Sequence, residues 1–190
     1  DYDIARFAFE LGSIAAARTH GHPSGYLPAG YLASLVALLS RGWELLPATG
    51  LAISILQSRP GAEETVTAVT RAMTLYRDTS VIPEPKTIET LGGGWVAEEA
   101  LAISLYCSLV FEDDLVSALR LAVNHSGDSD STGSITGNIL GALHGETALP
   151  VTWLQHLELS GVIRQMGEDL FAAFQGTRNW LKKYLPAAVK

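Results

Sequence analysis

Apolar residues recur at intervals of three and four along most of this chain, which is the spacing of one face of an α-helix. Sustained alternation of apolar and polar residues, which would indicate half-buried strands, is absent. The pattern predicts helices over residues 4–16, 29–40, 63–78, 95–110, 114–123, 133–144 and 153–174, the last broken near Gly161. Connectors of turn-forming residues are expected at residues 20–25, 46–50, 58–62, 82–86, 91–94 and 147–150. We therefore expect an all-α fold in which residues 1–190 form one compact multi-helix domain.

The composition is that of a packed protein, because 47% of its 190 residues are hydrophobic and its mean hydropathy is +0.20. A formal net charge of −7 argues against a broad surface for nucleic acid or anionic membrane, since such surfaces rely on Lys and Arg. Cys107 is the single cysteine and lies in an apolar run, which favours a buried structural thiol over a nucleophile. No stretch reaches the roughly 18 uninterrupted apolar residues of a membrane span. We expect a soluble, cytoplasmic protein with neither nucleic-acid nor membrane partners.

Glycine recurs every four residues along the segment that follows residue 132, at Gly133, Gly137, Gly141 and Gly145. Four residues advance a helix by about 400°, so these glycines form one slowly drifting stripe. Each costs roughly 0.5 to 1 kcal/mol relative to alanine inside a helix. We expect close packing against another helix to compensate, which would make this helix central to the fold.

The segment "HSGDSDSTGS", residues 125–134, is the densest group of oxygen-bearing side chains in the sequence. Asp128, Asp130 and Ser131 offer the hard oxygen ligands that Mg²⁺, Mn²⁺ and Ca²⁺ prefer. The alternative is a polar turn that caps the following helix. Because the segment joins two apolar helices, we expect its carboxylates to be enclosed, and an enclosed pair needs a cation or strong donors.

Three known motifs can be compared with this segment. An EF-hand loop fits from Asp128 to Gly133 but requires Glu at its twelfth position, where this chain has Ile139. A P-loop requires Lys after its last glycine, and no Lys follows Gly133. The D-x-D-x-T signature of haloacid-dehalogenase-type phosphotransferases matches literally, but it requires a β-strand before Asp128. An aspartyl phosphotransferase therefore remains a weaker alternative.

Three stretches of the chain, taken in order, resemble the ADP-ribosylglycohydrolase family, the group of dinitrogenase-reductase-activating glycohydrolase-like proteins, over its C-terminal half. They are "THGHPSGYLPAGYLASLVALLSRG", "LGGGWVAEEALAISLYC" and "AVNHSGDSDSTGSITGNILGALHG". The last carries the family's G-D-x-D-[ST] hallmark between an apolar helix and a helix of small residues. The resemblance implies an all-α fold and metal-dependent hydrolysis of the bond between ADP-ribose and a protein side chain or related acceptor, with two Mg²⁺ or Mn²⁺ ions. The expected partner is ADP-ribose or an ADP-ribosylated protein.

The resemblance also assigns roles to individual residues. It implies that Asp128, Asp130 and Ser131 ligate metal, with Ser131 standing where the family usually has threonine, and that Asp128 and Asp130 take part in catalysis. His20 falls where the family has a histidine lining the ADP-ribose site, although a histidine after an apolar helix can also serve as a cap. Gly93 and Gly94 could offer backbone N–H groups to a phosphate, and Trp95 falls where the family has an aromatic residue near the ligand. A glycine cluster at a helix end followed by a core tryptophan is the alternative.

The family's other metal ligands belong to a T-D-D cluster in an N-terminal half that this sequence does not include. The chain begins at Asp1, without methionine and directly in a helical pattern, so we expect it to be part of something longer. Its own N-terminal half is then a further expected partner. A non-catalytic member of the family, binding ADP-ribose or serving a structural role, is the alternative to a hydrolase.

Overall fold

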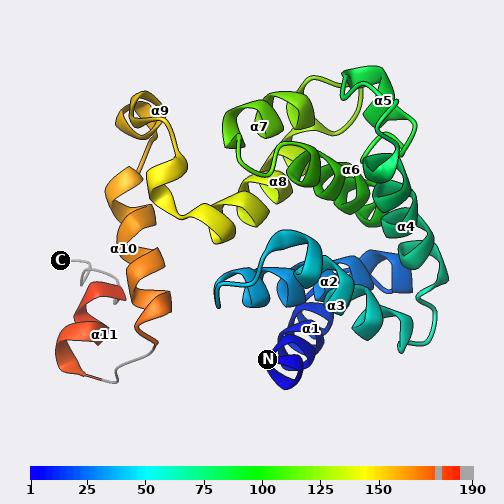
Figure 1. Ribbon diagram of the computed structural model, residues 1–190. Coiled ribbons are helices and arrows are strands. Elements are labelled where there is room, and N and C mark those ends of the chain that lie inside the picture. Colours follow the sequence, from blue (N-terminus) through cyan, green and yellow to red (C-terminus); the bar gives the residue numbers. More distant parts are fainter. Residues whose placement is uncertain (174–176, 185–190) are drawn as a thin grey trace. The chain divides into compact units, whose positions relative to one another are not determined.

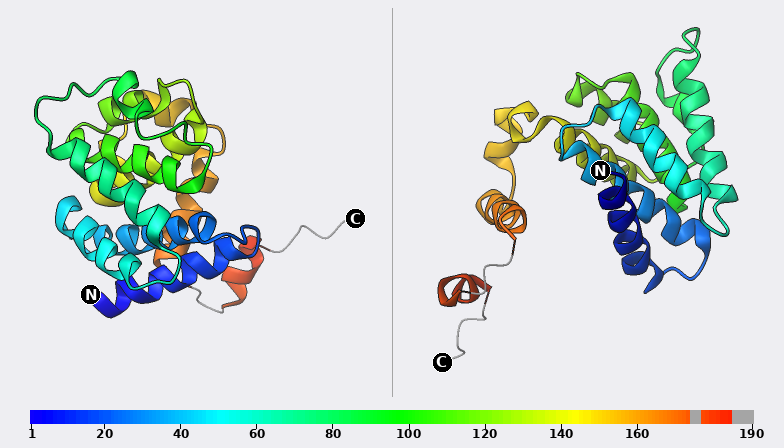
Figure 2. Two further views of the ribbon diagram at one scale, coloured as in Figure 1. Left: turned by 90° about the vertical axis from the view of Figure 1, so that its right-hand side faces the viewer. Right: turned by 60° about the horizontal axis from the view of Figure 1, so that its bottom comes forward.

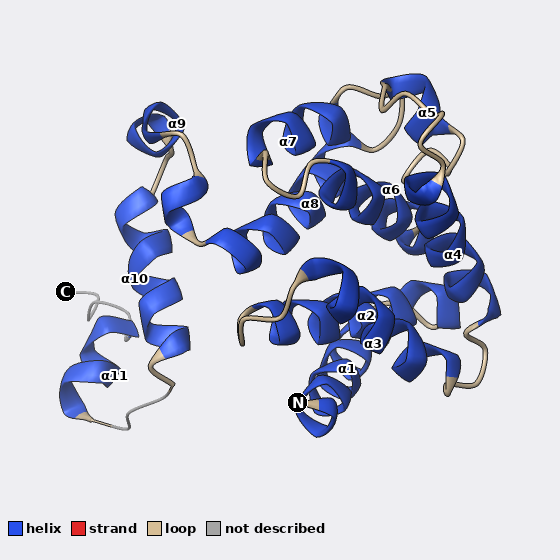
Figure 3. Ribbon diagram, in the orientation of Figure 1, coloured by secondary structure: helices blue, strands red, loops and turns tan. Residues whose placement is uncertain are grey.

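The computed structural model of the protein describes residues 1–173 and 177–184 and divides the chain into two compact units, Asp1–Leu149 and Pro150–Lys190 (Figure 1). Every regular element in the described ranges is a helix, and none is a strand (Figure 3). The prediction of an all-α fold is confirmed. The two units are described separately, and the expectation of one domain over residues 1–190 stays a prediction.

The first unit holds eight α-helices and one short 3₁₀ helix among its residues. They are α1 (Tyr2–Ala17), α2 (Pro23–Leu39), α3 (Leu45–Gln57), α4 (Glu63–Arg77), α5 (Pro85–Glu89), α6 (Ala97–Val110), α7 (Leu115–Val123), α8 (Ser129–His144) and η1 (Glu146–Ala148). Helix α2 contacts both α1 and α3, and α6 contacts α4, α7 and α8 (Figure 2). Helix α8 also contacts α2, so the predicted central position of the glycine-striped helix is confirmed within this unit.

Two α-helices of the first unit, α3 and α5, were not predicted from the sequence, and α5 begins within residues 82–86, which we expected to be a connector. Helix α3 runs through residues 46–50, which we expected to be a connector because they contain Pro47 and Gly50. Pro47 lies in the first turn, where a missing N–H costs no helical hydrogen bond. Gly50 is exposed, and the burial of neighbours such as Ala48 and Ala52 offsets its low helix propensity.

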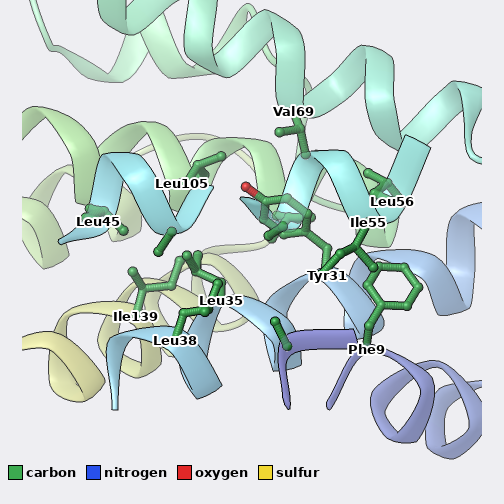
Figure 4. Close-up of a cluster of buried hydrophobic side chains, with 14 of the residues drawn as sticks. Phe9, Tyr31, Leu35, Leu38, Leu45, Ile55, Leu56, Val69, Leu105 and Ile139 are labelled. Carbon is green, nitrogen blue, oxygen red and sulfur yellow. The ribbon is translucent and has the colours of Figure 1, made fainter. Parts of the chain in front are cut away.

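The main hydrophobic core draws side chains from six helices of the first unit, α1, α2, α3, α4, α6 and α8 (Figure 4). Tyr31, Leu35 and Leu38 from α2 lie at its middle. Ile139 reaches it from α8 and is fully buried. The core therefore holds α8 in a fixed rotation about its own axis, which matters for the polar residues at its N-terminus.

A second apolar cluster joins α4 to α7 and contains Cys107. The thiol is free and buried, and burial raises its pKa to about 12. Such a thiol stays protonated at neutral pH, so it is a poor nucleophile. The prediction of a buried structural cysteine is confirmed.

The glycine stripe of α8 serves close packing at only one of its positions. A methyl group on Gly133 would lie 2.7 Å from Val123 of α7, whereas one on Gly137 would make ordinary contact with Leu119 at 3.7 Å. Gly141 has open space around it, and Gly145 ends the helix with a φ of +73° that favours glycine. The prediction of close backbone approach along the whole stripe is wrong beyond Gly133.

Helix α1 buries one face and exposes an apolar one. Ala5 and Phe9 are buried in the core, while the opposite side exposes Ile4 (42%), Phe7 (65%), Leu11 (53%) and Ile14 (62%). These four residues are spaced by three, four and three, which is the pattern of a seam that packs against another helix. We call this surface the α1 seam.

The second unit contains α9 (Val151–His156), α10 (Ser160–Phe171) and α11 (Arg178–Tyr184). The break between α9 and α10 falls at residues 157–159, slightly before the predicted position at Gly161. Asp169 of α10 is buried and pairs with Lys183 of α11 at 3.0 Å, so the ion pair links two helices of this unit. In the described part of the chain, no helix is long and apolar enough to cross a membrane.

Candidate functional site

A cavity of about 310 Å³ in the first unit brings together residues from three distant segments of the sequence. The segments are the connector between α1 and α2 with the first half of α2, the glycine turn with the start of α6, and the N-terminal part of α8. The cavity is lined by His20, Gly25, Pro28, Ala29, Leu32, Gly94, Trp95, Val96, Ala97, Ala100, Leu101, Asp128, Ser131 and Ile135. Five residues assigned to the site from the sequence are in this lining: His20, Gly94, Trp95, Asp128 and Ser131.

Helix periodicity selects which residues of α8 face the cavity. Asp128, Ser131 and Ile135 line it at steps of three and four, while Thr132 and Thr136 of the same helix are buried in the interior. Asp130 follows Asp128 by two residues, which is about 200° around a helix, so it is exposed and does not line the cavity. Only one of the two aspartates of the sequence motif therefore lines the cavity.

Asp128 is the N-cap of α8 and keeps its carboxylate at the cavity wall. Its side chain accepts a hydrogen bond from the N–H of Ser131 at 3.5 Å, so the capping role and the position at the cavity coexist. Hydrogen bonding to the Asp130 side chain, and then to Ser131, lowers the pKa of Asp128. The carboxylate is consequently ionised at neutral pH. The expectation that both carboxylates are enclosed is wrong, because Asp128 is half-buried and Asp130 exposed.

The donor chemistry of this segment fits a hard divalent cation, although the donor set is small. Asp128 and Asp130 lie close enough for a hydrogen bond between their side chains, and Ser131 adds a hydroxyl to the same turn. Across residues 1–173 and 177–184, no group of three or more His, Cys, Asp or Glu side chains forms a metal site. Octahedral Mg²⁺ or Mn²⁺ at this point would therefore take most of its ligands from water or from groups outside the described residues.

The glycine turn at residues 92–94 is held by the carboxylate of Glu99, which comes from the start of α6. Glu99 Oε2 accepts hydrogen bonds from the N–H groups of Gly93 (3.0 Å) and Gly94 (3.1 Å). Glu99 lies in the first turn of α6, where the helix dipole also favours a carboxylate. These N–H groups, which we expected to face a phosphate, are thus already bonded within the protein. Gly94 still lines the cavity with a φ of +74°, whereas Gly93 does not line it.

Trp95 and His20 lie at exposed positions of the cavity wall. The Trp95 side chain is 73% exposed, so the alternative of a core tryptophan is wrong. An indole in this position offers a flat apolar face to a ring of a ligand. His20 follows α1, and its Nδ1 hydrogen-bonds the Thr19 hydroxyl at 2.9 Å, which leaves its Nε2 edge for other contacts.

Two further residues support the acidic segment and were given no role from the sequence. His125 is buried; its Nδ1 accepts from the N–H of Gly127 (3.1 Å) and its Nε2 bonds the Thr132 hydroxyl (3.0 Å). Glu89 accepts from the N–H of Ser126 at 3.0 Å, and that bond lowers the Glu89 pKa. Only the three-dimensional arrangement brings Glu89 to residue 126, so no local sequence signal identifies it.

The aspartyl phosphotransferase alternative fails on its structural context. It requires a β-strand directly before Asp128, and the preceding element is helix α7, which ends at Val123. The loop from Asn124 to Gly127 then leads into α8. The literal D-x-D-x-T match is therefore coincidental.

Comparison with known proteins agrees with this arrangement. The ADP-ribosylglycohydrolase family matches residues 2–180. The chain is 39% identical over 90 residues to ADP-ribosylarginine hydrolase Tri1 of Serratia proteamaculans (strain 568), an alignment that covers 46% of this chain and 24% of that relative. It is 31% identical over 80 residues to ADP-ribosylarginine hydrolase Tri1 of Pseudomonas putida (strain GB-1), covering 41% of this chain and 20% of that relative. The alignments thus span about a quarter or less of these relatives, and no solved structure matches the chain. Since the family match extends over nearly the whole sequence, the chain belongs to the ADP-ribosylglycohydrolase family.

Proposed function

We propose that this chain forms the ADP-ribose side of a hydrolase that cleaves the bond between ADP-ribose and an arginine side chain. The family and the names of the two relatives support this activity and this acceptor. The observation that carries the proposal is the cavity, because it gathers His20, Trp95 and Asp128 from segments more than 30 residues apart in the chain. An aromatic ring, a histidine and an ionised carboxylate are suited to a nucleotide sugar.

The residues of the cavity divide the work between binding the ligand and orienting water. The exposed indole of Trp95 can stack on a ring of the ligand, and His20 can donate or accept a hydrogen bond at Nε2. Asp128 is ionised at neutral pH and faces the cavity, so it can ligate a cation and orient a water molecule by accepting its hydrogen bond. Apolar residues from α2 and α6, including Leu32 and Leu101, also line the cavity and offer an apolar surface to the ligand.

A divalent cation completes the proposal. Asp128, Asp130 and Ser131 would hold Mg²⁺ or Mn²⁺, and the bound metal would lower the pKa of its water and polarise the ribose oxygens. Asp130 is exposed, so its contribution to the site should be smaller than that of Asp128. The second ion expected for the family would need ligands beyond these three.

The test is release of ADP-ribose from an ADP-ribosylarginine protein, measured with and without Mg²⁺ or Mn²⁺. We expect Asp128→Asn to abolish release, since the amide neither ionises nor ligates as a carboxylate does. Asp114→Asn is the matched control, because Asp114 is likewise an aspartate N-cap, of α7, and does not line the cavity. Release that is metal-independent, or equal in Asp128→Asn and wild type, would refute the proposal.

A second candidate is binding of ADP-ribose without hydrolysis. The small donor set favours it, because the described residues supply two carboxylates and one hydroxyl to the acidic segment. Isothermal titration with free ADP-ribose separates the two candidates. Binding that depends on Trp95 but is accompanied by no release under any metal condition would identify a binding module.

We also propose that a polypeptide carrying the family's T-D-D segment docks on the α1 seam and completes the metal site. The seam is apolar, has helix-packing spacing and is exposed, and the relatives extend far beyond the matched segment. Co-expression with such a polypeptide should raise the Mn²⁺ affinity. Phe7→Glu should prevent the association while leaving the melting temperature of the chain unchanged. Association that tolerates Phe7→Glu and Leu11→Glu would place the contact elsewhere.

A further inference from the structure

Glu99 lies at the centre of a hydrogen-bonded connection between α6 and the acidic segment. Its Oε2 atom accepts from two consecutive backbone N–H groups, those of Gly93 and Gly94. Both bonds are charge-assisted, and such bonds are roughly twice as strong as neutral ones. A methyl group added to Gly92 would lie 2.3 Å from the Glu99 carboxyl carbon, so the turn wraps closely around this side chain.

The glycine turn that Glu99 holds is also hydrogen-bonded to Asp128, the candidate metal ligand. The carbonyl oxygen of Gly93 accepts a hydrogen bond of 2.8 Å from the N–H of Asp128. The same peptide lies against Gly127, where an added methyl group would be 1.9 Å from the Gly93 oxygen. Two hydrogen bonds in series therefore connect the Glu99 carboxylate to the backbone of Asp128. Gly94 also lies over this residue, since a methyl group there would be 3.6 Å from Asp128 Cβ.

We propose that Glu99 is a positioning residue that fixes the Gly93 peptide and, through it, the Asp128 carboxylate at the cavity. The proposal rests on the function proposed for Asp128. Glu99 does not line the cavity, so it acts on the ligand through backbone alone. The same bonds also fix the position of the Trp95 backbone, because Gly94 directly precedes Trp95 in the chain. One carboxylate thereby places both the ionised group and the aromatic face of the site.

Two substitutions separate the parts of this role. Glu99→Ala removes the acceptor and leaves two N–H groups unpaired. Glu99→Gln keeps an oxygen that can accept both bonds but lacks the charge. Glu63→Gln is the control, because Glu63 also lies in the first turn of a helix, α4, but its exposed carboxylate is not the acceptor of the Gly93 and Gly94 N–H groups.

The first readout is hydrogen exchange of the Asp128 amide, followed by NMR in the full chain. In Glu99→Ala this amide should exchange about tenfold faster, the factor that corresponds to loss of one hydrogen bond of typical net strength. Glu99→Gln should lie between Glu99→Ala and wild type, and Glu63→Gln should match wild type. The second readout is Mn²⁺ affinity, which should fall by about 10- to 100-fold in Glu99→Ala, as is typical when a group supporting a metal ligand is removed.

A merely structural role gives a different result. If Glu99 only stabilised α6 through its dipole, Glu99→Ala would lower the melting temperature while leaving Asp128 exchange and Mn²⁺ affinity unchanged, and the proposal would be overturned. If wild type binds no Mn²⁺, the metal part of the proposed function fails. Asp128 exchange still decides the role of Glu99 in that case, because it needs neither metal nor substrate.

Discussion

Gly127→Ala should separate the acidic segment from the glycine turn. The backbone at Gly127 does not have a positive φ, so alanine introduces no conformational strain of its own. Its methyl carbon would nevertheless lie 1.9 Å from the Gly93 carbonyl oxygen and 2.6 Å from the Gly93 carbonyl carbon. Ordinary contact begins near 3.4 Å, so the two loops must separate by about 1.5 Å.

The size of the effect follows from that displacement. The hydrogen bond from Asp128 N–H to Gly93 O is 2.8 Å long and cannot survive a movement of this size. Overpacking costs about 1 to 3 kcal/mol and the lost hydrogen bond about 0.5 to 1.5 kcal/mol, so we expect a loss of about 2 to 4 kcal/mol of unfolding free energy. In a chain of this length the melting temperature should fall by about 5 to 15 °C. A shift of about 1 Å at Asp128 should lower ADP-ribose release by about 100-fold.

The assays are thermal unfolding and ADP-ribose release, with Gly141→Ala as the matched control. Gly141 lies in α8 with open space around it, so alanine there should stabilise the chain by about 0.5 to 1 kcal/mol. The two glycine substitutions should therefore act in opposite directions. A melting temperature of Gly127→Ala at or above that of wild type would refute the close approach of the two loops.

Three further predictions concern the core, the pH dependence and the thiol. Ile139→Ala should cost about 2 to 5 kcal/mol in urea unfolding and Ile139→Val about 0.5 to 1.5 kcal/mol, because Ile139 is fully buried; equal costs would contradict its place in the core. Hydrogen bonds from Ser117 lower the pKa of Asp114 in the folded chain below its unfolded-state pKa of about 3.9. The ionised carboxylate therefore stabilises the fold above that unfolded-state pKa, and this stabilisation is lost as the pH falls through the lowered pKa of the folded chain. The difference in melting temperature between wild type and Asp114→Asn should thus be constant at neutral pH and shrink in that acidic range; a difference that grows on acidification would be contrary to this. Cys107 should resist iodoacetamide at pH 8 and react in urea, as followed by mass spectrometry, because burial raises its pKa to about 12; rapid labelling of the native chain would contradict its burial.

Helical periodicity was sufficient to predict the fold class and most helices, because burial of one face decides where a helix forms. It failed at α3, where Pro47 and Gly50 suggested a connector. Proline has a cost only after the first turn, and local composition does not reveal where that turn begins. The glycine stripe of α8 led to a prediction of too much close packing. Spacing alone does not distinguish Gly133, which is packed against Val123, from Gly141, which has open space around it.

The candidate site was predictable to the extent that its residues are local in sequence. Asp128 and Ser131 line the cavity as the motif suggests, whereas Asp130 does not. The motif gives only the spacing of these residues in the sequence, and the geometry of α8 decides which of their side chains face the cavity. Glu89 and Glu99 are bonded to loops that no sequence pattern connects to them. Their roles depend on long-range packing, which is available only from the structure.

The fixed rotation of α8 constrains the number of residues in this helix as well as their identity. Asp128 and Ser131 face the cavity only because Ile139, three turns further along, is anchored in the core. Deleting a single residue between Thr132 and Ile139 would turn the acidic end by about 100° relative to that anchor, even though every ligand would still be present. We therefore expect insertions and deletions to be tolerated in the connector after His144 and to abolish the site anywhere within the first three turns of α8, so that the number of residues in this helix is as much a part of the site as their identity.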